Sequence, residues 1–353
     1  MSPARRTSPA APPVLVEVTR GDHVESAHRG SIVVVAPEGS QIASVGDPDQ
    51  FIFLRSSAKP FQLAPFVASG RFDEYQLGPD ALAVMAASHS GEDRHVRLVQ
   101  EILRRAGLTS SVLQNQVHAP FDVETAHRLV RDGEKPTALR GNCSGKHAAM
   151  VLFAKASGWP VDTYWHPDHP VQRMALETMS ALSDVPMEHI ATATDGCGVV
   201  SFGMPLRGLA VAFARFADPS AVADPPLRGA LTRIRDAMIA HPELVAGERR
   251  RIDTALMRVG NGSLVAKGGA EGVGAVGLLP GCPGGWSPSG MALTIEDGGT
   301  TSRAVNVATC DALRQANVLD DQQMALLSEY ARPPVLDPRG AVSGEIRPAF
   351  SLG

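Results

Sequence analysis

Segments with the character of β-strands lie at both ends of this chain, and segments with helical patterns fill its middle. The strand-like segments are mostly β-branched runs bounded by Gly, Asp or Pro, at residues 14–19, 31–36, 41–45, 51–54, 274–279 and 291–296. The simplest architecture is an antiparallel sheet built from both termini, which includes the strand at 51–54 and is flanked by helices. We therefore predict an α/β (α+β) fold with an α-rich insertion at about residues 60–250.

Composition limits the class of protein. With 44% hydrophobic and 20% charged residues, the chain is expected to be a soluble globular protein. A net charge of −4 and the absence of a basic block argue against nucleic-acid binding, and no segment approaches a membrane span. Residues 1–13 are predicted to be a disordered tail, because no apolar stretch of a signal peptide follows the first arginines. We expect a cytoplasmic protein with one domain over residues 14–353.

Lysine is rare in this sequence. The chain has 28 arginines and five lysines, at positions 59, 135, 146, 155 and 267. Arg stays charged in proteins, whereas Lys can lose its proton and act as a base or offer a lone pair to a metal. Lys59, Lys146 and Lys267 each lie in a stretch rich in Gly, Ser or Cys, which is typical of a functional site.

One of these lysines completes a Ser-x-x-Lys motif, Ser56 to Lys59, directly after a strand-like run. If a helix begins at Ser56, the two side chains lie one turn apart on the same face. A serine nucleophile with a lysine base requires this arrangement, provided that burial or another cation lowers the pKa of the amine. The lysine spacing selects Ser56 over Ser57. The alternative is an ordinary N-cap serine beside a solvated lysine.

Three other stretches carry residues suited to chemistry. Residues 87–92 link two predicted helices and contain Ser88, although Ser88 could be a plain N-cap. The glycines around Lys267 allow the backbone to approach a ligand closely. Cys143, Lys146 and His147 share one face where a loop enters a helix, and Cys197 lies in a second loop. If the loops meet, two thiolates and one or two nitrogens would form a zinc site; the alternative is buried, unligated cysteine.

Together these motifs resemble those of the rhizobial-type (class 3) L-asparaginases, the L-asparaginase II family. The resemblance runs in order through nearly the whole chain. Its motifs are Arg55-Ser-Ser-Ala-Lys59-Pro-Phe-Gln, Ala87-Ser-His-Ser-Gly-Glu92, Asn142-Cys-Ser-Gly-Lys-His147, Thr194-Asp-Gly-Cys197 and Lys267-Gly-Gly-Ala-Glu-Gly272. It implies a fold similar to serine β-lactamases and penicillin-binding proteins. It also implies hydrolysis of L-asparagine to L-aspartate and ammonia by a homodimeric enzyme.

The resemblance also implies roles for particular residues. Ser56 with Lys59 and Ser88 with Lys267 would be two Ser–Lys pairs in one pocket, with Ser56 attacking the amide carbon. Zinc would be bound by the residues matching Cys143, Lys146 and Cys197, whereas geometry alone favours His147 over Lys146. Three further residues, Arg55, His147 and Asp195, are expected to contact the substrate or to support the site.

Two other functions remain open from the sequence. One is a different Ser–Lys amidase or esterase of the β-lactamase-like fold, although Lys267 is followed by Gly-Gly rather than by the usual Thr-Gly. The other is a non-catalytic protein of that fold that binds zinc or a small molecule. The run of arginines at residues 249–251 is expected to lie on a solvated helix face.

Overall fold

A large antiparallel sheet forms the centre of the computed structural model, which describes residues 11–298 and 303–353. Its strand order is β10-β11-β1-β2-β9-β8-β7, and β3 pairs with β2 beside this path. The strands are β1 (Val14–Arg20), β2 (His23–Val35), β3 (Gln41–Val45), β7 (Leu264–Ala266), β8 (Val273–Leu278), β9 (Ser289–Ile295), β10 (Pro334–Leu336) and β11 (Val342–Pro348).

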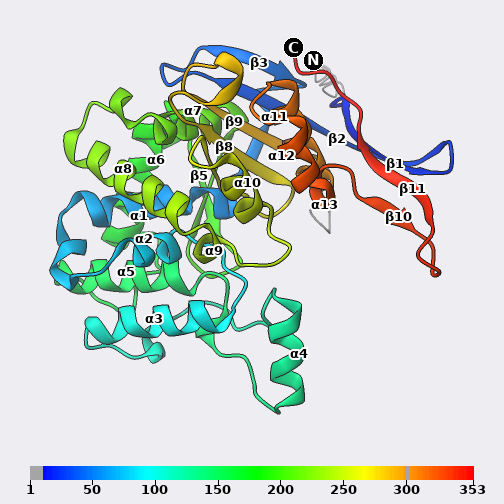
Figure 1. Cartoon of the computed structure of the whole chain (residues 1–353). Helices are drawn as coiled ribbons and strands as arrows, with labels where there is room; N and C mark the ends of the chain where they lie inside the picture. The colour runs from blue at the N-terminus through cyan, green and yellow to red at the C-terminus, as the bar shows by residue number, and fades with distance from the viewer. Residues whose placement is uncertain (1–10, 299–302) are drawn as a thin grey trace, which may run out of the picture.

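The two halves of this sheet come from opposite ends of the chain. Strand β2 pairs antiparallel with β9, in a register that aligns Val33 with Ala292, and β1 pairs with β11. Both pairings join residues about 260 or more positions apart. The predicted class, an antiparallel sheet built from both termini and flanked by helices, is confirmed (Figure 1).

The strand predicted at residues 51–54 exists, but it does not pair with the main sheet as expected. Residues 51–53 form strand β4 (Phe51–Phe53), but β4 belongs to a separate three-stranded sheet with β6 (Val200–Pro205) and β5 (Ala191–Thr194). Phe51 and Phe53 are exposed and Ile52 between them is buried, which is the pattern of a half-buried strand. Such a pattern does not show which neighbouring strand it pairs with. Strand β4 of this small sheet therefore directly precedes the Ser56 motif in the chain.

The helices lie on both faces of the main sheet and below one end of it (Figure 1). Their bounds are α1 (Lys59–Ala68), α2 (Pro79–Met85), α3 (Asp93–Arg105), α4 (Val123–Arg131), α5 (Ser144–Ala156), α6 (Pro170–Ser183), α7 (Leu206–Ala217), α8 (Pro225–Ala240), α9 (Pro242–Val245), α10 (Ile252–Gly260), α11 (Arg303–Gln315), α12 (Asp321–Leu326) and α13 (Ser328–Ala331). The predicted insertion at about 60–250 contains α1 to α9 and also β5 and β6; the division into domains stays a prediction. The predicted tail at residues 1–13 lies outside the described residues up to position 10.

Glycines in β8 and β9 set how closely the helices approach the sheet. Gly277 and Gly290 are cross-strand partners, and both face α7. A Cβ at Gly290 would lie 1.9 Å from the backbone oxygen of Ala210 in α7. Gly274, three residues before Gly277, instead faces Val305 and Thr309 of α11. The sheet is thus packed on both faces, with its backbone in direct contact with α7.

We expect Gly290→Ala to destabilise the protein by about 3 kcal/mol, because the added methyl group must push α7 away from the sheet. The matched control is Gly229→Ala on α8, where nothing lies within 4 Å of the added Cβ. There the substitution should be neutral or stabilising, since Ala favours a helix over Gly. Urea unfolding of both variants measures the difference; equal free energies of unfolding would contradict the close contact.

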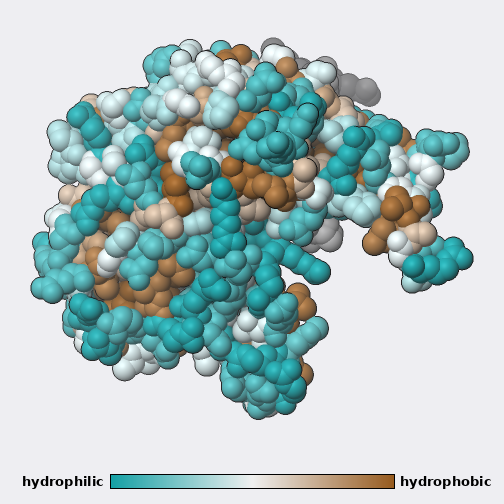
Figure 2. All heavy atoms as spheres, in the orientation of Figure 1, coloured by the Kyte–Doolittle hydropathy of each residue, from teal (hydrophilic) through white to brown (hydrophobic). Residues whose placement is uncertain are grey.

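The outer surface combines a hydrophilic covering with a projecting arm. Strands β10 and β11 form a hairpin that extends from the body together with β1 and β2 (Figure 1). Hydrophilic side chains cover most of the face in Figure 2, and hydrophobic ones show between helices of the body and on this arm. Exposed apolar residues of the arm include Leu336 and Val342. In the described part of the chain, no helix has both the length and the apolar character to cross a bilayer.

Candidate active site

The Ser56 motif lies in a 3₁₀ turn, Arg55–Ala58, that leads directly into α1. The expected helix therefore begins as a 3₁₀ turn, and Ser56 stands one turn before the buried start of α1 at Lys59. Pro60 falls in the first turn of α1, where its missing N–H costs little. Arg55 has a φ of 52°, a left-handed conformation that is unusual for a residue other than glycine and typical of functional sites.

Lys59 is buried, with 1% of its surface exposed. Its Nζ donates hydrogen bonds to Ser88 Oγ at 2.7 Å and to the backbone oxygen of Ala87 at 2.7 Å. Burial lowers the pKa of Lys59, while the Cys143 thiolate opposes this shift and Lys146 adds to it. Lys59 is thus hydrogen-bonded to Ser88, the serine that was expected to pair with Lys267. Ser56, the expected partner of Lys59, lies three residues before it in the sequence and is half-buried.

Lys267 is fully buried at the end of β7. Its Nζ lies 3.4 Å from Asp253 Oδ2 and donates to the backbone oxygen of Gly268 at 2.8 Å. Burial lowers the pKa of Lys267 to about 8; Asp253 opposes this shift, and Lys59 and Arg251 contribute to it. Lys267 is therefore a second buried lysine with a lowered pKa, and the charge of Lys59 is one of the causes.

The loop that carries Ser88 is held from the segment before α10. Arg251 donates to Ser90 Oγ at 2.9 Å and to the backbone oxygen of Ser88 at 2.8 Å. Neither Arg251 nor Asp253 was expected here, and the prediction of a solvated face for residues 249–251 is wrong for Arg251. The sequence of three arginines does not show which side chain points into the protein, because tertiary contacts determine that orientation.

The predicted zinc ligands also come together. Helix α5 begins at Ser144, directly after Cys143, and places Lys146 and His147 in its buried first turn. Lys146 Nζ donates to Cys197 Sγ at 3.0 Å. His147 Nδ1 bonds Tyr164 Oη at 2.7 Å, while its Nε2 is buried without a hydrogen-bond partner among the described residues. Lys146 Nζ is thus engaged with a thiol, whereas His147 Nε2 has no hydrogen-bond partner in the described part of the chain.

The two thiols form a charged cluster with the amine. Cys197 donates a hydrogen bond that lowers the pKa of Cys143; burial opposes this shift, and Lys59 and Lys146 contribute to it. Burial alone would lower the pKa of Lys146, but the thiols of Cys197 and Cys143 raise it. Thiolates and nitrogens are the ligands that zinc prefers. Within residues 11–298 and 303–353, no group of three or more His, Cys, Asp or Glu is placed to hold a metal, so Cys143, Cys197 and His147 do not form a ready-made site. The set Cys143, Cys197 and Lys146 includes a lysine and is a separate possibility.

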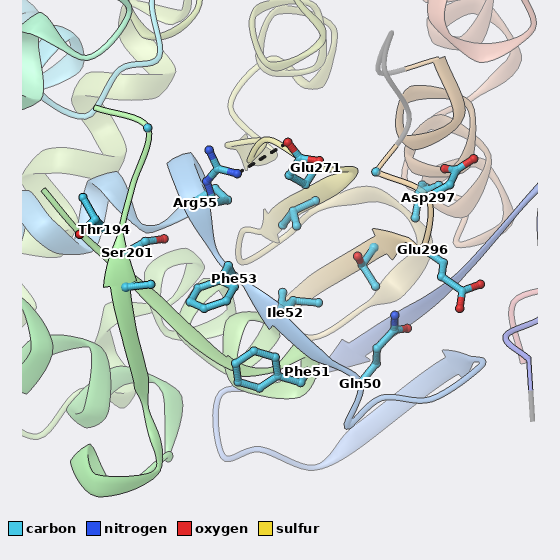
Figure 3. A pocket seen from close by; sticks show the side chains of 16 residues that line it. Gln50, Phe51, Ile52, Phe53, Arg55, Thr194, Ser201, Glu271, Glu296 and Asp297 are labelled. Carbon is cyan, nitrogen blue, oxygen red and sulfur yellow. Dashed lines mark ion pairs between the residues drawn. The ribbon is translucent and has the colours of Figure 1, made fainter. Parts of the chain in front are cut away.

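A cavity of about 530 Å³ opens beside Arg55 (Figure 3). Arg55 Nε pairs with Asp195 Oδ1 at 2.8 Å, and a second guanidinium nitrogen lies 3.7 Å from Glu271 Oε1. Phe51 and Phe53 of β4 line the same cavity, and Glu296 lies on its far side (Figure 3). Ser56, Lys59, Ser88 and Lys267 do not line this cavity, so it is not the pocket that the two Ser–Lys pairs were expected to share. Arg55 is the one predicted catalytic or substrate-contacting residue on its wall.

Sequence comparison identifies the family. A profile of the L-asparaginase II family matches residues 16–348. The chain belongs to the L-asparaginase II family. Membership makes the protein an amidohydrolase, in agreement with the resemblance seen in its motifs. No curated protein sequence matches this family member.

Several solved structures resemble the chain at low sequence identity. One is a Bacillus glutaminase in the presence of 4.3 M NaCl, with 12% identity, a TM-score of 0.40, and coverage of 81% of this chain and 90% of that one. Another is a probable glutaminase from Bacillus subtilis complexed with 6-diazo-5-oxo-L-norleucine. It has 11% identity, a TM-score of 0.39, and coverage of 82% of this chain and 84% of that one.

Proposed function

We propose that this member of the family is an L-asparaginase that hydrolyses L-asparagine to L-aspartate and ammonia through an acyl-enzyme. The observation that carries the proposal is that Lys59 and Lys267 are both buried in a chain of this family, with Lys59 Nζ hydrogen-bonded to Ser88 Oγ. A buried amine with a lowered pKa can act as a base near neutral pH. A lysine without a catalytic role usually keeps its charged amine in water and is not buried.

In the proposed reaction, Lys59 Nζ accepts the proton of Ser56 as Oγ bonds to the side-chain amide carbon of the substrate. Ser88, which is hydrogen-bonded to Lys59, passes a proton on to the amide nitrogen. The C–N bond then breaks and ammonia leaves. Water attacks the aspartyl ester and returns a proton to Ser56, which releases L-aspartate. Lys267 supplies the second positive charge that keeps Lys59 neutral.

The Lys59–Ser88 hydrogen bond also supports an alternative nucleophile. Ser88 Oγ lies 2.7 Å from the amine, within the range expected between a nucleophile and its base. In that version, Ser88 attacks the amide and Ser56 relays the proton. The substrate contacts are the same in both versions: Arg55 takes the α-carboxylate, and His147 and Asp195 support the site.

Release of ammonia by the purified protein tests the proposed function. L-Asparagine, L-glutamine and a chromogenic cephalosporin are compared at equal concentration. We expect turnover of asparagine with little activity on glutamine. Turnover of the cephalosporin alone would show a different Ser–Lys hydrolase, and binding without turnover of any of them would show a non-catalytic protein.

We also propose that zinc binds Cys143, Cys197 and Lys146, with His147 as the alternative nitrogen ligand. The fit rests on two buried thiols and an amine 3.0 Å from one of them. Lysine must lose its proton to bind a metal, and Zn²⁺ would replace the charge that the proton supplies. When bound, the ion would supply a Lewis acid able to orient the carboxylate or amine of the substrate.

We expect Cys197→Ser to reduce the zinc content from about one ion per chain to a small fraction of that, because a thiolate ligand is lost. Elemental analysis of the dialysed protein measures this without any activity assay. The control is Cys282→Ser, which changes a buried cysteine outside the cluster and should leave the zinc content intact. Lys146→Met and His147→Ala then show which nitrogen binds. Equal zinc in both cysteine variants would contradict the site.

Assembly and location are further parts of the proposal. We propose a homodimer in the cytoplasm, with small-molecule substrate as the only ligand besides zinc. Light scattering of the purified protein gives the mass of the assembly. A monomer at micromolar concentration would contradict the proposed dimer.

A further inference from the structure

The first turn of α10 and the residue before it contact both the loop that carries Ser88 and the side chain of Lys267. Arg251 precedes the helix and reaches the Ser88 loop, while Asp253 lies in its first turn and reaches Lys267. Two residues apart in sequence, they thus hold two segments that are separated by almost 180 positions. We propose that Asp253 and Arg251 are positioning residues for catalysis: Asp253 holds Lys267 in its charged form, and Arg251 fixes the loop that presents Ser88.

Asp253 is placed to orient Lys267 from two directions. Its Oδ2 lies 3.4 Å from Lys267 Nζ, and its Oδ1 accepts a hydrogen bond from the backbone N–H of Gly268 at 3.0 Å. The carboxylate thereby binds both the side chain and the backbone that follows it. The whole contact is buried, and a buried carboxylate beside an ammonium strongly favours the charged form of the amine.

Arg251 is anchored in the same way on the other side. Its guanidinium bonds the Ser88 backbone oxygen and Ser90 Oγ, and lies 5.8 Å from the centre of the Phe121 ring. Ser90 Oγ in turn donates to the backbone oxygen of Ala246 at 2.8 Å, and the Ser88 N–H donates to Val245. The Ser88 loop is therefore held by the residues that lead into α10.

The charges around Lys267 explain why a carboxylate is needed. The groups that face it are Asp253 and Arg251 from the α10 segment and Lys59 from α1. Two of these three are basic and the site is buried, so without Asp253 the amine would lose its proton at lower pH. A neutral Lys267 would no longer repel a proton from Lys59. The role in catalysis rests on the proposed function; the effect of Asp253 on the charge of Lys267 does not.

The test is Asp253→Asn, which keeps the shape of the side chain and can still accept the bond from Gly268. We expect kcat to fall by about 10- to 100-fold, with little change in KM. We expect the alkaline limb of the wild-type pH–rate profile near pH 8, where Lys267 loses its proton, and we expect it to move down by about one unit or more in the variant. A purely structural role would lower activity or stability without moving this limb.

A second readout does not depend on turnover. Cyanate carbamylates only neutral amines, so the rate of modification of Lys267 across pH, mapped on its peptide, gives its titration midpoint. We expect the midpoint to fall in Asp253→Asn in step with the alkaline limb. If wild-type protein does not hydrolyse asparagine but the midpoint still moves, the proposed function fails while Asp253 keeps its effect on Lys267.

Control variants separate charge from folding. Asp311→Asn removes another buried carboxylate, one that bonds Arg314 and Gln315 on α11, and should leave both profiles unchanged. Asp253→Glu keeps the negative charge, so its alkaline limb should stay close to that of the wild type even if kcat falls. Should Asp253→Asn not fold, a shifted limb in Asp253→Glu would overturn the proposal. An unchanged limb and midpoint in a folded Asp253→Asn would overturn it equally.

The contribution of Arg251 is tested with Arg251→Lys. Lysine keeps the positive charge but cannot make both hydrogen bonds with the planar geometry of a guanidinium. We expect a fall in kcat of about tenfold with an unchanged alkaline limb, because only the Ser88 loop is loosened. A shift of the limb, or an unchanged kcat, would contradict this division of roles.

Discussion

Replacing Lys59 with Arg is expected to lower kcat for L-asparagine by about 10³-fold or more, while KM changes little. Arg keeps a positive charge and hydrogen-bond donors, but it cannot lose a proton at physiological pH. General bases typically contribute 10²- to 10⁴-fold to the rate, and here the base must also activate the nucleophile. Steady-state ammonia release measures the effect.

The control is Lys155→Arg, because Lys155 is exposed on α5, away from the site. It should keep wild-type kinetics. Since the larger guanidinium has to fit where Lys59 is buried, thermal unfolding and zinc content are measured alongside, and Lys59→Met provides a smaller replacement. A folded, zinc-loaded Lys59→Arg enzyme with kcat within a few-fold of the wild type would show that Lys59 is not the base.

The second large effect concerns the two serines. We expect Ser56→Ala to lower kcat by about 10⁴-fold, because it removes the attacking oxygen. Ser88→Ala should cost less, about 10²-fold, since water can replace a proton relay in part. Stopped-flow kinetics with a chromogenic amide or ester of aspartate measures acylation directly.

Ser57→Ala is the matched control for this pair. Ser57 is buried in the same turn, but its hydroxyl donates to the backbone oxygen of Leu54 at 2.6 Å and not toward the lysines. Its kcat should stay within a few-fold of the wild type. If Ser88→Ala is the more damaging of the two active-site variants, the roles of Ser56 and Ser88 are exchanged, as the Lys59–Ser88 hydrogen bond would allow.

The sequence predicts the sheet well because β-branched runs bounded by turns carry local information. Strands at 14–19 and 291–296 are found within a residue or two as β1 and β9. The partner of β4 could not be predicted, since pairing depends on which strands the helices bring alongside. In the small sheet, β6 lies between β4 and β5 and pairs with both, and local pattern does not encode these pairings.

In the candidate site too, some residues could be predicted from the sequence and others could not. Lys59, Lys146 and Lys267 stand out because this chain uses Arg elsewhere, and all three are buried. Asp253 and Arg251 carry no such mark, since aspartate and arginine are common on helix surfaces. Their position becomes visible only when α10 packs against the strand that carries Lys267. Glu271 lies in the motif that begins at Lys267, but its contact with Arg55, more than 200 residues earlier, becomes visible only in the structure.

The central claim, that Ser56 attacks the amide of an asparagine-sized substrate, is tested most directly by covalent labelling. A diazo-ketone analogue of L-asparagine loses N₂ when a nucleophile displaces it and leaves a stable bond to the attacking atom. We expect one label per chain, on the peptide that contains Ser56, with loss of asparagine turnover in proportion and protection by added aspartate. Labelling of Ser88 instead, or full turnover with neither serine labelled, would contradict it.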